Sequence, residues 1–201
     1  MKTCQLMILL MFFASPLARG QNVPEAISAQ CAACHGEDGV SSQPGLPHLN
    51  GQLENYLIDS MLKFQKGTRP TEVPNHIPKT LERGSIELVA KHYAASKAVR
   101  PKQEVDPDKL ARGETVFRNR CADCHMDNGR DADKDSPLMA GQNLGYMIDQ
   151  SRLFVSGKRK FGFMQDEAFK GLSDDDLQAA AVFFASQEQF APKASGKKKR
   201  R

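Results

Sequence analysis

The feature that most constrains this chain is a five-residue motif, Cys-x-x-Cys-His, which occurs at 31–35 and again at 121–125. Two thiols three residues apart on one helical turn can reach the two vinyl groups of one porphyrin, and the adjoining imidazole then lies under the ring. The motif therefore predicts two covalently bound haem c groups. Their thioether anchors would be Cys31, Cys34, Cys121 and Cys124, and their proximal iron ligands His35 and His125.

Two other interpretations of the cysteines are a disulfide framework and a zinc site made of both pairs. A disulfide framework does not require a histidine after each pair. The wide separation of the pairs, within matching repeats, disfavours one shared zinc ion. Cys4, the fifth cysteine, lies in the N-terminal leader, so no thiol is left over for a redox switch.

Residues 1–20 have the pattern of a secretory signal peptide. Lys2 precedes an apolar stretch over 6–14, and Ala18 and Gly20 place small residues just before Gln21. An uncleaved anchor is the alternative, but the apolar run is well short of a bilayer span. We therefore expect a periplasmic protein with no membrane span in its mature chain.

Charge gives no support for nucleic-acid binding. The chain has 28 Lys and Arg against 24 Asp and Glu, and five of the basic residues form the C-terminal run 197–201. The excess of positive charge is therefore a property of a short basic tail, 193–201, that we expect to be disordered. No basic face interleaved with aromatic residues accompanies it.

An internal repeat sets the predicted domain organisation. Residues match at an offset of 90: Gly39 with Gly129, Pro47 with Pro137, Gln52 with Gln142, Tyr56 with Tyr146, Phe64 with Phe154, and Arg69 with Arg159. We expect one domain over 21–99 and a second over 100–192.

Both repeats predict an all-α fold. Apolar residues recur at helical spacing over 56–64 and over 146–154, and Ser85 and Ser173 are candidate caps of each last helix. No segment has the alternation of a convincing strand. A unit of about 80 residues has a thin core, so we expect each domain to wrap around its haem.

The sixth iron ligand distinguishes the two repeats. Met164, expected in the loop before Leu172, is the candidate in the second repeat. The equivalent stretch of the first repeat, 71–79, contains no methionine. His76 is the candidate there, and Lys79 and an open or water-bound site are the alternatives.

The motifs with Pro47, Gly51-Gln52, Tyr56 and the residues that follow resemble the dihaem class I cytochromes c. Within this group the chain is similar to cytochrome c4 and to the cytochrome subunit of flavocytochrome c sulfide dehydrogenase. The resemblance implies two tandem class I cytochrome c domains, and a carbonyl of Pro47 and of Pro137 that orients each proximal histidine. Such proteins usually carry methionine on both irons, a pattern from which the first repeat departs.

These observations lead us to expect a periplasmic dihaem cytochrome that transfers single electrons between redox proteins, with a membrane oxidase among the possible partners. One alternative is the cytochrome subunit of a flavoprotein sulfide dehydrogenase, with the flavin on another subunit because the chain has no dinucleotide motif. Another is a haem enzyme or ligand-binding protein with an open or non-methionine first haem. We expect an electron carrier rather than an enzyme.

Overall fold

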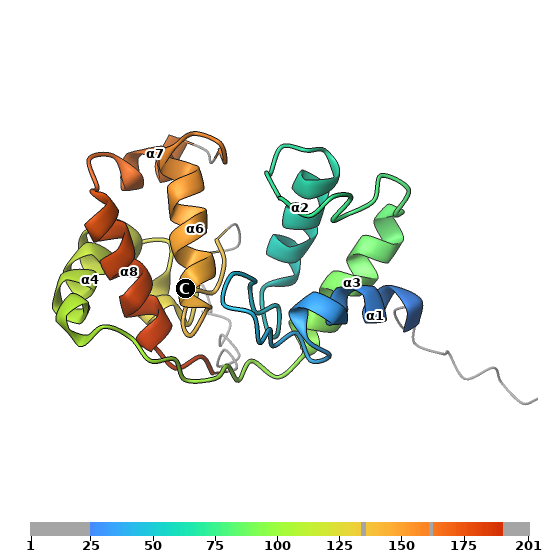
Figure 1. Ribbon diagram of the computed structural model, residues 1–201, viewed down its shortest axis with the longest axis horizontal. Helices are drawn as coiled ribbons and strands as arrows, with labels where there is room; N and C mark the ends of the chain where they lie inside the picture. The colour runs from blue at the N-terminus through green and yellow to red at the C-terminus, as the bar shows by residue number, and fades with distance from the viewer. Residues whose placement is uncertain (1–24, 134–135, 161–162, 191–201) are drawn as a thin grey trace, which may run out of the picture.

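A computed structural model describes residues 25–133, 136–160 and 163–190, without the side chains of 25–28 and 163–165. The predicted signal peptide and basic tail lie outside these residues. Every regular element in the described part is helical. The first three helices form unit 1 and the remaining elements form unit 2. Figure 1 shows the two units joined by an extended linker along the lower edge.

Unit 1 consists of α1 (Glu25–His35), α2 (Glu54–Gln65) and α3 (Arg83–Ala95). Its core is formed by buried side chains of α2 and α3, namely Leu57, Val89, Ala90 and Tyr93. Cys31, at the start of the first haem motif, packs against this core. The haem motif is thus held by the helix pair that forms the interior of the unit.

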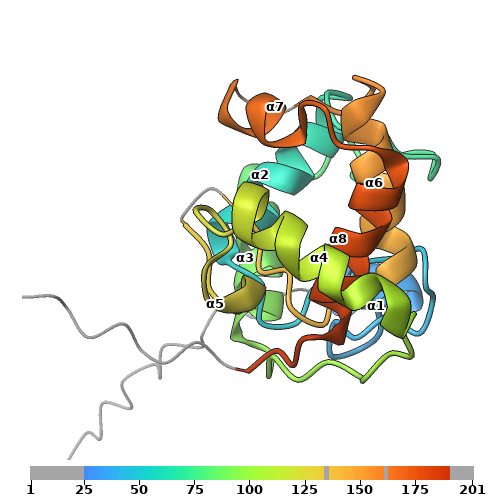
Figure 2. The ribbon, with the colours of Figure 1, turned by 90° about the vertical axis from the view of Figure 1, so that its left-hand side faces the viewer.

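Unit 2 has more elements. They are η1 (Pro107–Lys109), α4 (Leu110–Val116), η2 (Phe117–Cys121), α5 (Met126–Gly129), α6 (Leu144–Val155), α7 (Phe163–Phe169) and α8 (Asp174–Ser186). Helices α4 and α8 cross closely, as Figure 2 shows. A Cβ added at Gly113 of α4 would lie 2.1 Å from the carbonyl oxygen of Ala179. Only glycine therefore allows this crossing.

The predicted middle helices are confirmed, and the predicted cap of the last helix is confirmed in unit 2 alone. Ser173 forms a capping box with Asp176 at the start of α8. The expected cap at Ser85 is wrong, because α3 begins at Arg83 and has Glu82 as its N-cap residue. The Ile86 N–H already bonds to the carbonyl of Glu82, at 3.1 Å, so Ser85 lies inside the first turn.

Two glutamines join the units by matching hydrogen bonds. The side chain of Gln52 accepts from the Leu138 N–H and donates to its carbonyl, at 2.8 and 3.0 Å. The side chain of Gln142 makes the same pair of bonds to His48, at 2.7 and 2.9 Å. Each glutamine is 3% exposed. The repeat positions therefore pair across the interface with approximate two-fold symmetry.

No helix in the described part of the chain is both long enough and apolar enough to span a membrane.

Candidate haem sites

The first haem motif lies at the C-terminal end of α1. The ring Nδ1 of His35 is 3.1 Å from the carbonyl oxygen of Pro47, and His35 is 8% exposed. A carbonyl can only accept a hydrogen bond, so Nδ1 must carry the proton in this contact. The lone pair of the neutral ring is then on Nε2, the nitrogen left for a metal. Burial lowers the pKa of His35, and this keeps the ring neutral.

The second motif reproduces this arrangement on a different local backbone. It begins at the end of the π-helical turn η2, and the ring Nδ1 of His125 is 2.9 Å from the carbonyl oxygen of Pro137. Burial lowers the pKa of His125 as well. The proline contacts implied by the family resemblance are therefore present in both units, and each leaves Nε2 available as a ligand.

None of the four motif cysteines is paired in a disulfide. Burial raises the pKa of Cys31 and raises that of Cys121 to about 11. Covalent haem attachment requires cysteines that are not paired in disulfides, next to an imidazole that can bind iron, since each S–H adds across a vinyl group. The donor set of both units therefore fits haem c. The Cys–Cys disulfide alternative is not formed in either unit.

The distal side of unit 1 is formed by the segment between α2 and α3, where His76 faces the proximal histidine. The ring centroids of His35 and His76 are 6.1 Å apart, with an angle of 26° between the ring planes. The edge of the His76 ring also contacts Phe64 of α2, at a centroid distance of 4.6 Å. Burial lowers the pKa of His76, and the nearby His35 and Arg69 lower it further.

The corresponding segment of unit 2, between α6 and α8, contains a helix. Met164, expected in a loop, lies instead in the first turn of α7. This segment has no proline and consists mainly of helix-forming residues, whereas the unit 1 segment contains Pro70, Pro74 and Pro78. The Met164 side chain lies outside the described residues.

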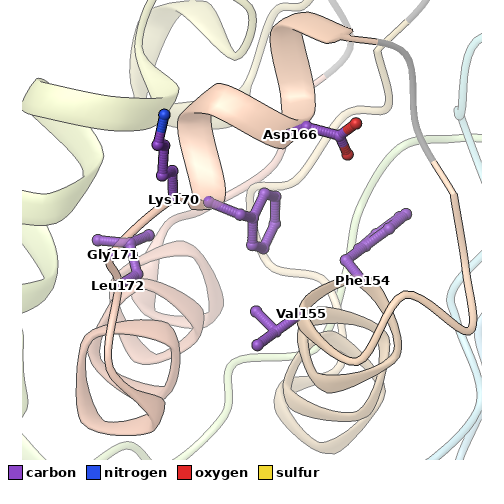
Figure 3. A pocket seen from close by; sticks show the side chains of 7 residues that line it. Phe154, Val155, Asp166, Lys170, Gly171 and Leu172 are labelled. Atoms are coloured by element: carbon purple, nitrogen blue, oxygen red, sulfur yellow. The ribbon is translucent and has the colours of Figure 1, made fainter.

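A hollow lies between the C-terminal end of α6 and the end of α7 (Figure 3). Phe154, Phe169 and Leu172 contribute apolar surface to it, and Lys170 lies at its edge. Phe154 is the repeat counterpart of Phe64, which contacts His76 in unit 1. The hollow therefore lies beside the distal region of unit 2.

Two arginine–tyrosine contacts cross the interface near the distal sides. Arg69 Nη2 donates to the Tyr146 hydroxyl at 2.6 Å, and Arg159 Nη2 donates to the Tyr56 hydroxyl at 3.4 Å. Burial alone would raise the pKa of Tyr56, but the two guanidinium groups outweigh it and lower the pKa to about 7. Burial raises the pKa of Tyr146 and outweighs the same two groups there. The cluster therefore joins the units by placing two guanidinium groups against two phenol hydroxyls.

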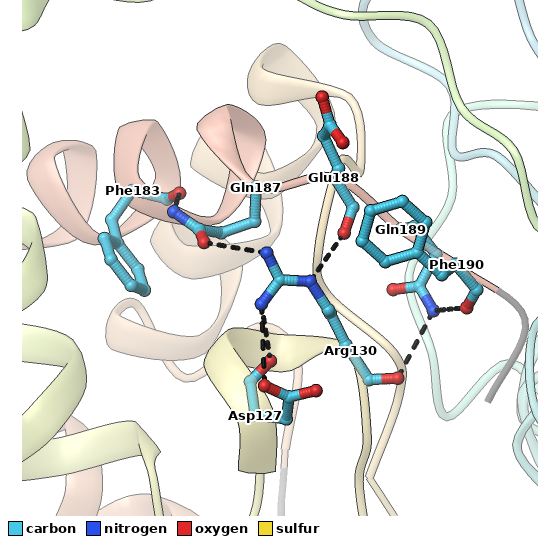
Figure 4. Close-up of polar contacts among 7 residues, drawn as sticks. All are labelled: Asp127, Arg130, Phe183, Gln187, Glu188, Gln189 and Phe190. Atoms are coloured by element: carbon cyan, nitrogen blue, oxygen red, sulfur yellow. Dashed lines mark hydrogen bonds and ion pairs between the residues drawn. The ribbon is translucent and has the colours of Figure 1, made fainter. Parts of the chain in front are cut away.

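Unit 2 has an additional polar cluster beside its haem motif, centred on Arg130 (Figure 4). The Arg130 Nε donates to the carbonyl of Glu188 at 2.8 Å, and its Nη1 lies 3.6 Å from Asp127 Oδ1. Its backbone carbonyl accepts from the Gln189 side chain at 3.2 Å. The turn after His125 is thus fixed to the segment that follows α8. Val40 is the repeat counterpart of Arg130, so unit 1 cannot form this cluster.

The cross-unit arginine and tyrosine pairs had no role assigned from the sequence. Their only sequence signal is that Tyr56 and Arg69 are both kept at the matching positions of the second repeat. His48 is buried at the interface, where its Nδ1 accepts from the Ser41 N–H at 3.1 Å, so its role is structural.

Comparison with known proteins agrees with the motifs. A cytochrome c family model matches residues 110–188. Cytochrome c4 from Pseudomonas aeruginosa is 31% identical over 172 residues, which cover 79% of this chain and 84% of that protein. The chain belongs to the cytochrome c4 family. It is a dihaem electron carrier with two covalently bound haem c groups, one for each motif.

Three further similarities refine this assignment. The crystal structure of reduced recombinant cytochrome c4 from Pseudomonas stutzeri matches with a TM-score of 0.70 and 26% identity, over 81% of this chain and 95% of that one. The thiosulfate dehydrogenase electron acceptor of Thiomonas intermedia is 27% identical over 201 residues, 94% of this chain and 91% of that protein. Similarity to the cytochrome subunit of sulfide dehydrogenase from Chlorobaculum tepidum covers only 34% of this cytochrome c4 homologue.

Proposed function

We propose that this cytochrome c4 homologue works in the periplasm, where it accepts single electrons from a dehydrogenase that oxidises an inorganic sulfur compound. The observation that carries the proposal is the similarity to a thiosulfate dehydrogenase electron acceptor along 94% of the chain. From this cytochrome the electrons would pass to a further periplasmic redox protein or to a membrane oxidase.

When bound, the haem iron supplies the one-electron chemistry. In unit 1, proposed to span 21–99, Cys31 and Cys34 hold haem 1 and His35 offers Nε2 to its iron. In unit 2, proposed to span 100–192, Cys121, Cys124 and His125 do the same for haem 2. Met164 is our proposed distal ligand there, supported by its place in the segment between α6 and α8, which corresponds to the segment of unit 1 that carries His76.

The sulfide dehydrogenase alternative has weaker support. Its similarity is confined to 34% of the chain, whereas similarity to the thiosulfate dehydrogenase acceptor extends over both units. The alternative of an open first haem that binds small ligands is disfavoured by the position of His76, whose ring faces His35. We therefore place this protein among carriers rather than enzymes.

The partner is tested by mixing the oxidised mature holoprotein with a purified thiosulfate dehydrogenase. Adding thiosulfate should reduce both haems, as followed by their visible absorption, and no reduction should occur without the dehydrogenase. The comparison sample contains a flavoprotein sulfide dehydrogenase subunit and sulfide. Fast reduction in that sample, with none in the first, would contradict the proposal and favour the alternative.

Localisation is tested separately by expressing the full chain and fractionating the cells. We expect haem-containing protein in the periplasmic fraction with an N-terminus at or near Gln21. Retention of residues 1–20 on a membrane-bound product would contradict the proposed signal peptide.

A further inference from the structure

We infer that the iron of haem 1 is bound by two imidazoles, with His76 as the distal ligand opposite His35. The inference rests on the proposed attachment of haem 1 to unit 1, and it deepens the proposed function because it makes the two haems chemically different. Haem 1 would have bis-histidine ligation, whereas the proposed ligands of haem 2 are His125 and Met164.

The distance between the two rings agrees with an iron between them. Two metal–nitrogen bonds of about 2 Å each, together with the offset of each nitrogen from its ring centre, place the centres of two axial imidazoles roughly 6 Å apart. The ring centres of His35 and His76 are 6.1 Å apart.

The surroundings of His76 also suit a ligand. Its Nδ1 is buried and has no hydrogen-bond partner in the described part of the chain. Burying a ring nitrogen that makes no hydrogen bond costs free energy, unless a group that is not part of the protein chain binds the ring. The neighbouring Phe64 contacts the ring edge and limits its rotation.

The backbone that presents His76 is held in an unusual conformation. Asn75 has a φ of +51°, in the left-handed region that asparagine adopts more readily than most side chains. The His76 N–H closes a turn to the carbonyl of Val73 at 3.2 Å. Here the turn directs one side chain toward the proximal histidine.

The other candidates for this position are less well placed. Lys79 is exposed, beyond the proline at 78. Met61 of α2 packs against the hydrophobic core of unit 1, in the cluster that includes Leu57 and Tyr93. No methionine occurs between α2 and α3. The repeat aligns Met164 with Val73 or Pro74, and His76 lies two or three residues further along the same segment.

Bis-imidazole ligation should give haem 1 the lower reduction potential, because imidazole stabilises ferric iron better than a thioether does. Electrons would then enter at unit 1 and settle at unit 2. The direction of transfer within the molecule would follow from this one difference between the distal sides.

The direct test is near-infrared magnetic circular dichroism, with electron paramagnetic resonance, of the oxidised mature holoprotein. We expect two low-spin haems in equal amounts, one with a bis-imidazole charge-transfer band. Because the ring planes differ by only 26°, that haem should give a rhombic signal with three resolved g values. Two histidine–methionine signatures, or a high-spin or histidine–lysine signature for haem 1, would overturn the inference.

Variants provide a second readout. His76→Gly should convert one haem to a high-spin form that binds carbon monoxide when reduced, and added imidazole should restore the low-spin signal. Lys79→Ala and the exposed His92→Gly are matched controls that should leave both signals unchanged. If Lys79→Ala alters haem 1 and His76→Gly does not, the inference is wrong.

Failure of this inference is distinguishable from failure of the proposed function. Reduction by a sulfur-compound dehydrogenase reports on carrier function whatever the ligands are. The spectra report on ligation whether or not any partner is present.

Discussion

In both units a proline carbonyl oxygen faces the Nδ1 of the histidine that ends the haem motif, at 3.1 Å in unit 1 and 2.9 Å in unit 2. The segments between the middle and last helices differ in local structure. Unit 1 presents His76 from a proline-rich segment, and unit 2 presents the helix α7. A duplicated fold can therefore keep the chemistry of attachment constant while the distal segment adjusts each iron separately.

The largest effect is expected from making the two distal sides alike. His76→Met should raise the potential of haem 1, on the order of 0.1 V, because a thioether stabilises ferrous iron relative to imidazole. The potential of haem 2 should change little. Spectroelectrochemical titration measures both, and Lys79→Met is the control. An unchanged titration curve in the His76 variant would show that this side chain does not set the difference.

A second contrast concerns His48 and its apolar repeat counterpart Leu138, both buried at the interface. Burial, with the charge of Arg100, lowers the pKa of His48 to about 4. The unfolded chain, in which a histidine titrates near 6.5, therefore binds this proton more readily. Stability should fall as pH decreases from about 6.5 to 4, by about 3 kcal/mol in all.

His48→Asn keeps an acceptor for the Ser41 N–H and removes the titrating ring. Urea unfolding of the two holoproteins across this pH range measures the difference. The variant should lose less stability than the wild type on acidification. If the free energy of unfolding falls equally with pH in the variant and the wild type, protonation of His48 does not cause the loss of stability.

The interface itself is not fully symmetric. The Arg69–Tyr146 hydrogen bond is 2.6 Å long, whereas the Arg159–Tyr56 contact is 3.4 Å. Tyr146→Phe should therefore destabilise the holoprotein by about 1.5–3 kcal/mol, the range for a hydrogen bond to a charged group. Tyr56→Phe should cost at least as much, because the guanidinium groups of both Arg69 and Arg159 act on the Tyr56 hydroxyl. Urea unfolding compares the two variants, and a smaller loss for Tyr56→Phe would contradict this expectation.

The smallest effect separates two serines near the starts of the last helices of the two units. Ser173→Ala removes the capping box of α8 and should cost about 1 kcal/mol. Ser85→Ala should cost almost nothing, because α3 begins at Arg83 and Ser85 caps no helix. Thermal unfolding of the two variants under one set of conditions decides this. A larger loss for Ser85→Ala would mean that the first turn of α3 is wrongly assigned.

The features that sequence could predict are those fixed by neighbouring residues. The haem motifs, the middle helices and the cap at Ser173 depend on short-range spacing, and the structure has them where the pattern places them. The helix α7 was not predicted from the sequence, because a methionine ligand was expected in a loop at this position. Proline content distinguishes the two distal segments and would have favoured a helix in unit 2.

Short-range sequence patterns could not predict the contacts between the units. Arg69 and Tyr146 are 77 residues apart, and Arg159 and Tyr56 are 103 apart, so no local pattern indicates that they meet. Repeat matching identified all four positions without assigning a partner to any. His76 is an intermediate case, since the missing methionine indicated the position and the 6.1 Å distance to His35 gives it a geometric basis.

The proposed difference between the two haems is tested most directly by a potentiometric titration of the mature holoprotein. Absorption and magnetic circular dichroism recorded together should resolve two one-electron steps. The haem with the bis-imidazole signature should be the last to be reduced, and His76→Met should bring the two steps together. A single signature for both haems, or a bis-imidazole haem that is reduced first, would contradict the account.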